Sequence, residues 1–153
     1  MTKLFTALFL ALTTADMGIK QYIEETWKKG EERDTVLPGV VCRKVYNKGF
    51  FMNALDKHPK VIKGVSAMLA LVIGIYDYLL FQERGHWLEK LGMVFISAGA
   101  VSNIFDRLVR GKVIDYFGIK CKAKKIRRLT ANLADVYVLL GSILLLILNI
   151  KKK

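Results

Sequence analysis

Long apolar runs, separated by polar and charged connections, dominate the pattern of this 153-residue chain. A helix needs roughly 20 mostly apolar residues to cross a hydrocarbon core of about 30 Å. Four runs approach this length: residues 4–22, 64–81, 87–108 and 133–150. The first run has one early cation, Lys3, and leads into Asp16 and Lys20 without a convincing cleavage site. We therefore expect a retained first helix rather than a signal peptide.

The connections differ in length, which predicts how the runs are arranged. The first and third connections are long, whereas the second is short, so four spans place both long connections on the side opposite the two termini. Residues 24–36 are charged and are typical of a surface turn or helix end. Residues 40–51 alternate and are rich in β-formers after the turn dipeptide Pro38-Gly39, and the third connection holds one apolar strand-like piece. The pattern predicts an all-α membrane protein with four transmembrane helices and a small β-like cradle, in a single integral membrane domain (residues 1–153).

Composition and charge support this interpretation. Apolar residues make up 53% of the chain and the mean hydropathy is +0.30. Lys and Arg number 25 against 13 Asp and Glu, a net charge of +12 that by itself suggests nucleic acid or an anionic membrane surface. Because the apolar runs favour the membrane, we expect no nucleic-acid partner. With two cysteines, Cys42 and Cys121, a disulfide-rich scaffold is excluded, and unpaired thiols are favoured over a disulfide between them.

Charged and amide side chains inside apolar runs are costly and indicate function. Asp16 and Lys20 are four residues apart and share a helix face, either as a neutralised ion pair or in direct work on a substrate. Asp106 and Arg107 are adjacent, so each needs a partner on another element. Asp77 lies near the opposite membrane boundary, and we expect it to be a solvated interface residue.

Two carboxylates, Asp115 and Asp135, lie next to the ends of predicted membrane helices on the same side of the membrane. Asn132 shares a helix face with Asp135 and is also a good helix N-cap. If the carboxylates meet, they share one proton, which is the chemistry of aspartic peptide hydrolysis; the alternative is two isolated interfacial aspartates. His58 and His86 are isolated and no metal-ligand spacing is present, so we expect no metal and no cofactor.

Five short motifs, in order, resemble those of the lipoprotein signal peptidase (signal peptidase II) family. The run GAVSNIFDRLVRGKVIDYF and the later ANLAD carry three of them: Asn103 with Asp106 and Arg107, then Val113-Ile114-Asp115-Tyr116, then Asn132-Leu133-Ala134-Asp135. The weaker two are Tyr46-Asn47-Lys48-Gly49-Phe50 and Asp16 through Lys20. The chain is similar to a divergent member, because Ser102 stands where the family usually has glycine, Ala131 replaces an aromatic residue and Met17 replaces glutamine.

The resemblance implies an intramembrane aspartyl endopeptidase. It would remove the signal peptide from diacylglyceryl-modified prolipoproteins, cutting just before the lipidated cysteine. The implied roles are these: Asp115 and Asp135 are catalytic, Asn47, Gly49, Asn103, Arg107, Asn132 and Ala134 support the substrate, and Asp16, Lys20 and Asp106 are structural polar residues. Globomycin-type inhibitors are implied ligands, and a monomer is expected. The small residues 97–100 and Ser102 have an alternative role in close helix packing.

The resemblance also implies a place in the cell: the bacterial cytoplasmic membrane, with cytoplasmic termini and an extracytoplasmic active site and cradle. Six Lys and Arg lie on the side of the termini and eighteen on the other side, which by the positive-inside rule predicts the opposite orientation. We give the ordered motifs more weight, since the rule weakens for long loops. The basic run 120–128 is then expected to meet anionic lipid headgroups.

Three other functions stay open from the sequence. One is a catalytically silent relative that binds lipidated or signal peptides, and another is a small membrane transporter with Asp16, Lys20 and Asp135 along an ion path. The third is a serine–lysine peptidase with Ser102 as nucleophile, for which no suitably placed lysine is evident.

Overall fold

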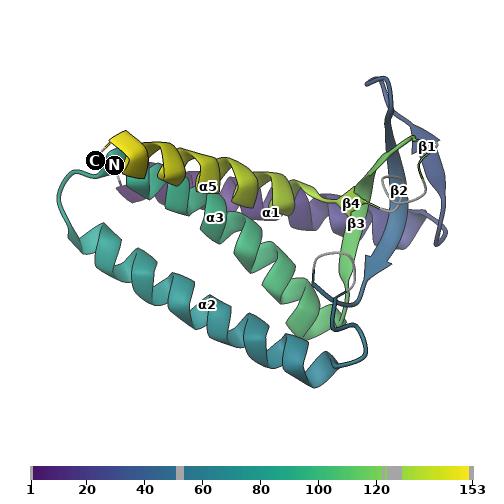
Figure 1. Cartoon of the computed structure of the whole chain (residues 1–153), viewed down its shortest axis with the longest axis horizontal. Coiled ribbons are helices and arrows are strands. Elements are labelled where there is room, and N and C mark those ends of the chain that lie inside the picture. Colours follow the sequence, from purple (N-terminus) through teal and green to yellow (C-terminus); the bar gives the residue numbers. More distant parts are fainter. Residues whose placement is uncertain (1, 51–53, 122, 124–128, 152–153) are drawn as a thin grey trace.

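A computed structural model describes residues 2–50, 54–121, 123 and 129–151 of the chain (Figure 1). The elements, in chain order, are helix α1 (Thr2–Thr26), strands β1 (Glu32–Asp34) and β2 (Val40–Asn47), helices α2 (Pro59–Gln82) and α3 (Trp87–Phe105), the π-helical segment η2 (Asp106–Arg110), strands β3 (Val113–Ile119) and β4 (Thr130–Ala131), and helix α5 (Leu133–Lys151). In this part of the chain four helices, with α3 continued by η2, are long and apolar enough to cross a membrane. The prediction of four membrane-crossing helices is confirmed.

The helices begin and end slightly outside the predicted apolar runs. The first run, 4–22, becomes α1 from Thr2 to Thr26, and the second begins at Pro59 rather than at 64. Lys60 and Lys63 interrupt the apolar pattern, yet both are exposed in the first turns of α2. Proline suits the first helical position because its missing N–H is not needed there.

Helix α3 is the centre of the bundle. Within the chain 56% of its membrane span is buried, against 11–17% for the other three spans. It packs against α1, α2 and α5. The approach of α5 requires glycine, because a Cβ on Gly99 would collide with the carbonyl oxygen of Ala134. Small residues allow such contact between helices in lipid, so the prediction of close packing is confirmed at Gly99.

The sheet lies at one end of the bundle, and both chain termini lie together at the other end (Figure 1). Its four strands are antiparallel in the order β1-β2-β3-β4. The strand-like pieces expected in the two long connections are β2 and β3. Strand β1 lies in the charged stretch expected to be a turn or helix end; its residues are exposed, so the sequence shows no apolar alternation there.

Two local features set the geometry around β3. Gly111 has a φ of 71° and ends η2, in the left-handed conformation that glycine adopts without strain. In the pairing of β2 with β3, Val45 lies opposite Asp115, which puts Asn47 on the same face as Asp115. Both cysteines of the chain fall in its described part, where Cys42 and Cys121 are free thiols.

Candidate active site

A cavity of about 540 Å³ lies where the sheet meets the helix ends. Residues of α2, α3 and α5 line it together with residues of β2, β3 and β4, and both the helices and the strands contribute polar side chains. Asp115 and Asp135 both line it. The structure therefore brings to one cavity the two carboxylates that the sequence placed on the same side of the membrane.

Asp115 enters this cavity from β3. Asp115 is 2% exposed, and three side chains donate hydrogen bonds to its carboxylate. The side-chain amide of Asn132 donates to Oδ1 at 3.0 Å, and the Thr130 hydroxyl and the Asn47 amide donate to Oδ2 at 2.9 and 3.4 Å. The carboxylate is thus fixed by groups from β2, β4 and the residue before α5.

Asp135 lies in the first turn of α5. The Asn103 side-chain amide on α3 donates to its Oδ1 at 2.8 Å, and the Asn132 backbone N–H donates to its Oδ2 at 3.1 Å. In return, the Asp135 N–H donates to Oδ1 of Asn132 at 3.0 Å. This reciprocal pair is a capping box. The N-cap role predicted for Asn132 is confirmed, and capping also accounts for one contact of Asp135.

The electrostatics of the cavity favour a shared proton. Burial raises the pKa of the Asp115 carboxyl from its ordinary value of 3.8 to about 6, and the charge of Asp135 acts in the same direction. Two carboxylates that repel each other lose their protons in separate steps. The pair therefore combines one ionised and one protonated carboxyl over a range of pH.

Arg107 lines another part of the cavity and binds the turn at Gly49, between the lining residues Asn47 and Phe50. The Arg107 guanidinium donates to the carbonyl oxygens of Asn103 at 3.2 Å and Gly49 at 3.4 Å, and it stacks on the Phe50 ring. The Gly49 N–H donates to Oδ1 of Asn47 at 3.0 Å, which closes a tight turn after β2. The weak sequence motif around Asn47 and Gly49 thus lies at the same cavity as the stronger motifs.

A buried ion cluster lies beside the site. The Lys20 ammonium contacts Asp16 at 2.7 Å and Asp106 at 3.1 Å, and all three side chains are fully buried. Arg110 also pairs with Asp106 at 2.8 Å. Lys20 donates to Oδ1 of Asn103 at 2.8 Å, so the cluster reaches the Asp135 side of the site through one amide. Asp106 finds its partners on α1 and on Arg110, as the adjacency of Asp106 and Arg107 required.

The sequence did not predict the contacts of three residues in this region, and it named Ser102 only as an alternative nucleophile without a nearby lysine. That expectation was wrong about the lysine, because the Lys20 ammonium donates to the Ser102 hydroxyl at 3.1 Å. Thr130 donates to Asp115; Ser102 and Tyr116 both contact Asp16, at 2.5 and 2.8 Å. Thr130 stands two positions before Asn132, and that proximity was its one available signal. Ser102 was marked as a departure from the family motif and Tyr116 as part of the Val113-Ile114-Asp115-Tyr116 motif, but neither signal indicated Asp16 as the partner.

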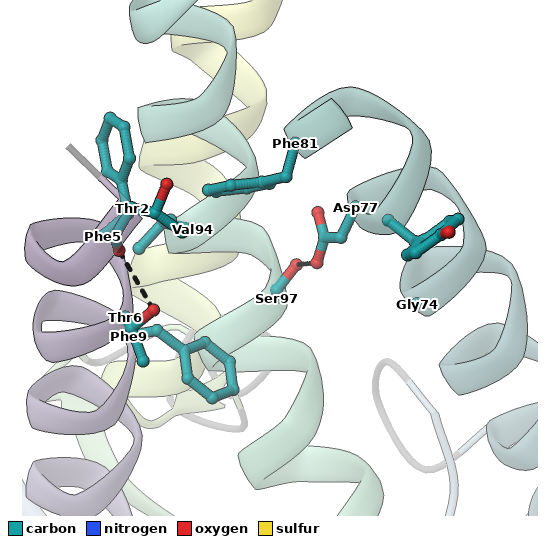
Figure 2. Close-up of a pocket in the computed structure, with 10 residues that line it drawn as sticks. Thr2, Phe5, Thr6, Phe9, Gly74, Asp77, Phe81, Val94 and Ser97 are labelled. Atoms are coloured by element: carbon teal, nitrogen blue, oxygen red, sulfur yellow. Dashed lines mark hydrogen bonds between the residues drawn. The ribbon is translucent and has the colours of Figure 1, made fainter. Parts of the chain in front are cut away.

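A second cavity of about 440 Å³ lies nearer the termini, between α1, α2 and α3. Figure 2 shows aromatic side chains of α1 and α2 around it, with Asp77 of α2 turned toward Ser97 of α3. The Ser97 hydroxyl donates to Asp77 at 2.5 Å. The expectation of a solvated interface residue was wrong for Asp77. Its side chain is partly buried between α2 and α3, where it accepts the hydrogen bond from Ser97.

Four membrane-crossing helices and a cavity lined by two carboxylates, a buried Asp115 and a more exposed Asp135, are features of a membrane-embedded aspartic peptidase. The family model described as "Signal peptidase (SPase) II" matches residues 8–151. The lipoprotein signal peptidase of Streptococcus pneumoniae is 30% identical over 147 residues, 95% of this chain and 92% of that protein. That of Clostridioides difficile is 36% identical over 83 residues, 54% of this chain and 52% of that protein.

A solved structure of a bacterial membrane enzyme shares the fold, with a TM-score of 0.83 at 19% identity over 97% of this chain and 88% of that one. The chain belongs to the signal peptidase II family, a family of aspartic peptidases whose function is the cleavage of prolipoprotein signal peptides.

Proposed function

We propose that Asp115 and Asp135 are the catalytic pair of this chain, and that they cut a diacylglyceryl-modified prolipoprotein just before its lipidated cysteine. The observation that carries the proposal is that a single residue, Asn132, binds both carboxylates at one cavity between membrane helices. The two carboxylates are therefore held as a unit rather than as two separate interfacial aspartates.

The pair supplies both proton transfers of hydrolysis. The ionised carboxylate takes a proton from a water molecule, whose oxygen attacks the carbonyl carbon of the residue before the cysteine. The protonated carboxyl gives its proton to the cysteine nitrogen as the C–N bond breaks, leaving a free amine and a carboxylate end on the signal peptide. The two carboxyls exchange these roles as a pair that shares one proton.

The polar lining of the cavity is suited to an extended substrate backbone. The Asn47 and Asn103 amides and the Arg107 guanidinium line the cavity and can bind peptide carbonyl groups. Ala134 is fully buried and its N–H donates to Asp16 at 3.2 Å, so its support is given through the start of α5 rather than by contact with substrate. The apolar walls on α2 and α5 suit the lipid and the signal helix.

We further propose that the chain is one membrane domain of the bacterial cytoplasmic membrane, with cytoplasmic termini and the site on the extracytoplasmic side. The termini and the sheet lie at opposite ends of the bundle, which supports their opposite sidedness (Figure 1). After both native cysteines are changed to serine, a cysteine at Val36 should react with an impermeant maleimide on spheroplasts. A cysteine at Arg84 should react after permeabilisation alone, and the reverse labelling would overturn this orientation.

The remaining partners are proposals of the same kind. Globomycin-type inhibitors are expected to occupy the cavity of Asp115 and Asp135, and the peptidase is expected to work as a monomer. The basic run 120–128 is proposed to lie on anionic headgroups; residues 122 and 124–128 of that run lie outside the described residues, so this rests on their charge.

One assay tests the proposed function. Purified protein is mixed with a prolipoprotein peptide that carries a diacylglyceryl cysteine, or with its unlipidated twin, each with and without globomycin. We expect cleavage before the cysteine of the lipidated peptide, and its loss with globomycin. Absence of cleavage by folded protein would favour a silent relative that binds such peptides.

A further inference from the structure

One buried carboxylate, Asp16 on α1, is bound by donors from four elements. Lys20 of α1 and Ser102 of α3 contact Oδ2, at 2.7 and 2.5 Å. The Tyr116 hydroxyl of β3 and the Ala134 N–H of α5 donate to Oδ1, at 2.8 and 3.2 Å. Because Asp16 is fully buried, these contacts replace water entirely, and they fasten β3, α3 and α5 to α1 at one point.

Side chains bind every free N–H group at the start of α5. A helix leaves its first N–H groups without partners inside the helix. Here Asn132 and Asp135 bind each other's N–H, the Leu133 N–H donates to the Tyr116 hydroxyl at 2.9 Å, and the Ala134 N–H donates to Asp16. The Tyr116 hydroxyl thus donates to Asp16 and accepts from Leu133, and the position of α5 depends on both bonds.

The same carboxylate is connected to the amide that binds Asp135. The Ser102 hydroxyl donates to Asp16 and accepts from the Lys20 ammonium at 3.1 Å. Lys20 in turn donates to Oδ1 of Asn103, which turns the Asn103 NH₂ group toward Asp135. Reversing that amide would place its NH₂ against the ammonium, so the position of Lys20 determines the orientation of Asn103.

We propose that Ser102 and Tyr116 are positioning residues of the peptidase reaction. Their hydroxyl groups hold Asp16 against Lys20 and the start of α5, and thereby fix the Asn103 and Asn132 amides that bind the two catalytic carboxylates. The proposal rests on the proposed function of Asp115 and Asp135. Neither residue lines the cavity of the site, so their effect on the reaction passes through these amides.

The test compares Ser102→Ala and Tyr116→Phe with the control Ser97→Ala. Ser97 lies on the same helix and donates an equally short bond, 2.5 Å, to a membrane carboxylate, Asp77, that has no contact with the site. Cleavage of the lipidated peptide is measured as kcat and KM for each variant, over a range of pH, together with thermal unfolding in detergent. A hydrogen bond contributes about 1 kcal/mol, so we expect kcat to fall roughly 5- to 10-fold with KM nearly unchanged.

Two further readouts separate positioning from general stability. A weaker hydrogen bond from the Asn132 amide to Asp115 destabilises the ionised carboxylate and raises its pKa. The pH at which kcat/KM declines should therefore move upward by roughly half a unit. In an Asp16→Asn background the effects of Ser102→Ala and Tyr116→Phe should largely vanish, because both act through Asp16. If that background fails to fold, the double variant Ser102→Ala/Tyr116→Phe replaces it, with a combined loss smaller than the product of the single losses.

The outcomes separate the two proposals. Equal kcat values for Ser102→Ala, Tyr116→Phe and Ser97→Ala would overturn the positioning role. So would losses in all three variants that simply follow their unfolding temperatures. Failure of the proposed function itself would show differently, as an absence of cleavage by the parent protein or as full cleavage by Asp115→Asn.

Discussion

Asp115 and Asp135 both accept hydrogen bonds from Asn132. The Asn132 side-chain amide donates to Asp115, and the Asn132 backbone N–H donates to Asp135. A strand and a helix that are separated by a long connection are thus joined at the carboxylates themselves. The residue that caps α5 thus also connects the two carboxylates of the proposed catalytic pair.

The first consequence is a pH dependence of cleavage. The pair is competent while it holds one proton, and the pKa of Asp115 is raised to about 6 by burial and by the charge of Asp135. As the pH rises through that value the free enzyme loses the shared proton, so kcat/KM for the lipidated peptide should decline with a limb near pH 6. A kcat/KM that instead increases steadily from pH 5 to pH 8 would assign the proton differently.

The second consequence concerns stability. Since the pKa of Asp115 in the fold lies above its ordinary value of 3.8, the folded state favours the protonated form. Stability is lost as the pH rises from about 4 through 6. Asp115→Asn removes this loss, worth at most about 3 kcal/mol at pH 7.

Thermal unfolding in detergent checks this prediction at two pH values. The Asp115→Asn variant should unfold at a higher temperature than the parent at pH 7.5, and the difference should shrink at pH 4.5. An inactive variant that is less stable at both values would contradict the expected cost of ionising Asp115.

The buried ammonium of Lys20 gives a third prediction. Lys20→Met would leave Asp16 and Asp106 buried with one fewer cation between them, and removing one partner of a buried ion pair costs about 3–5 kcal/mol. We expect a large fall in unfolding temperature and in the yield of folded protein. Lys120→Met is the control, because its pair with Asp34 is mostly exposed and contributes little. Equal stability of the two variants would remove the structural role of the cluster.

The packing of α3 on α5 gives a fourth prediction. Gly99→Ala places a Cβ against the carbonyl oxygen of Ala134, so α5 must shift away and carry Asp135 from Asn103. Both the unfolding temperature and kcat should fall. The control is Gly18→Ala on α1, where a Cβ meets nothing in the described structure within 4 Å. A Gly99→Ala protein as active as Gly18→Ala would mean that this contact does not set the site.

The sequence predicted the spans because membrane helices need long apolar runs, whatever their neighbours are. It predicted β2 and β3 from alternation, but β1 is short, polar and exposed, and only its pairing with β2 reveals it. The helix ends were displaced where Lys60 and Lys63 interrupted the pattern while the backbone continued as a helix.

The sequence predicted most residues of the site, but not how they contact one another. Asp115, Asp135, Asn103 and Asn132 could be found because charged and amide groups at membrane boundaries are costly, and the family motifs added Asn47. The double contact of Asn132 and the meeting of Ser102 and Tyr116 at Asp16 depend on how distant elements pack, which local patterns do not contain. The error at Asp77 has the same origin, since its partner Ser97 lies on another helix.

The central claim is that Asp115 and Asp135 together cut the lipidated substrate, and one comparison of variants tests it most directly. Asp115→Asn, Asp135→Asn and the control Asp77→Asn are purified, shown to be folded by thermal unfolding, and assayed on the diacylglyceryl-modified peptide. General acid and base groups contribute roughly 10²–10⁴-fold each, so the first two variants should lose at least about that much activity, while Asp77→Asn stays near the parent. Robust cleavage by folded Asp115→Asn or Asp135→Asn would contradict the catalytic pair.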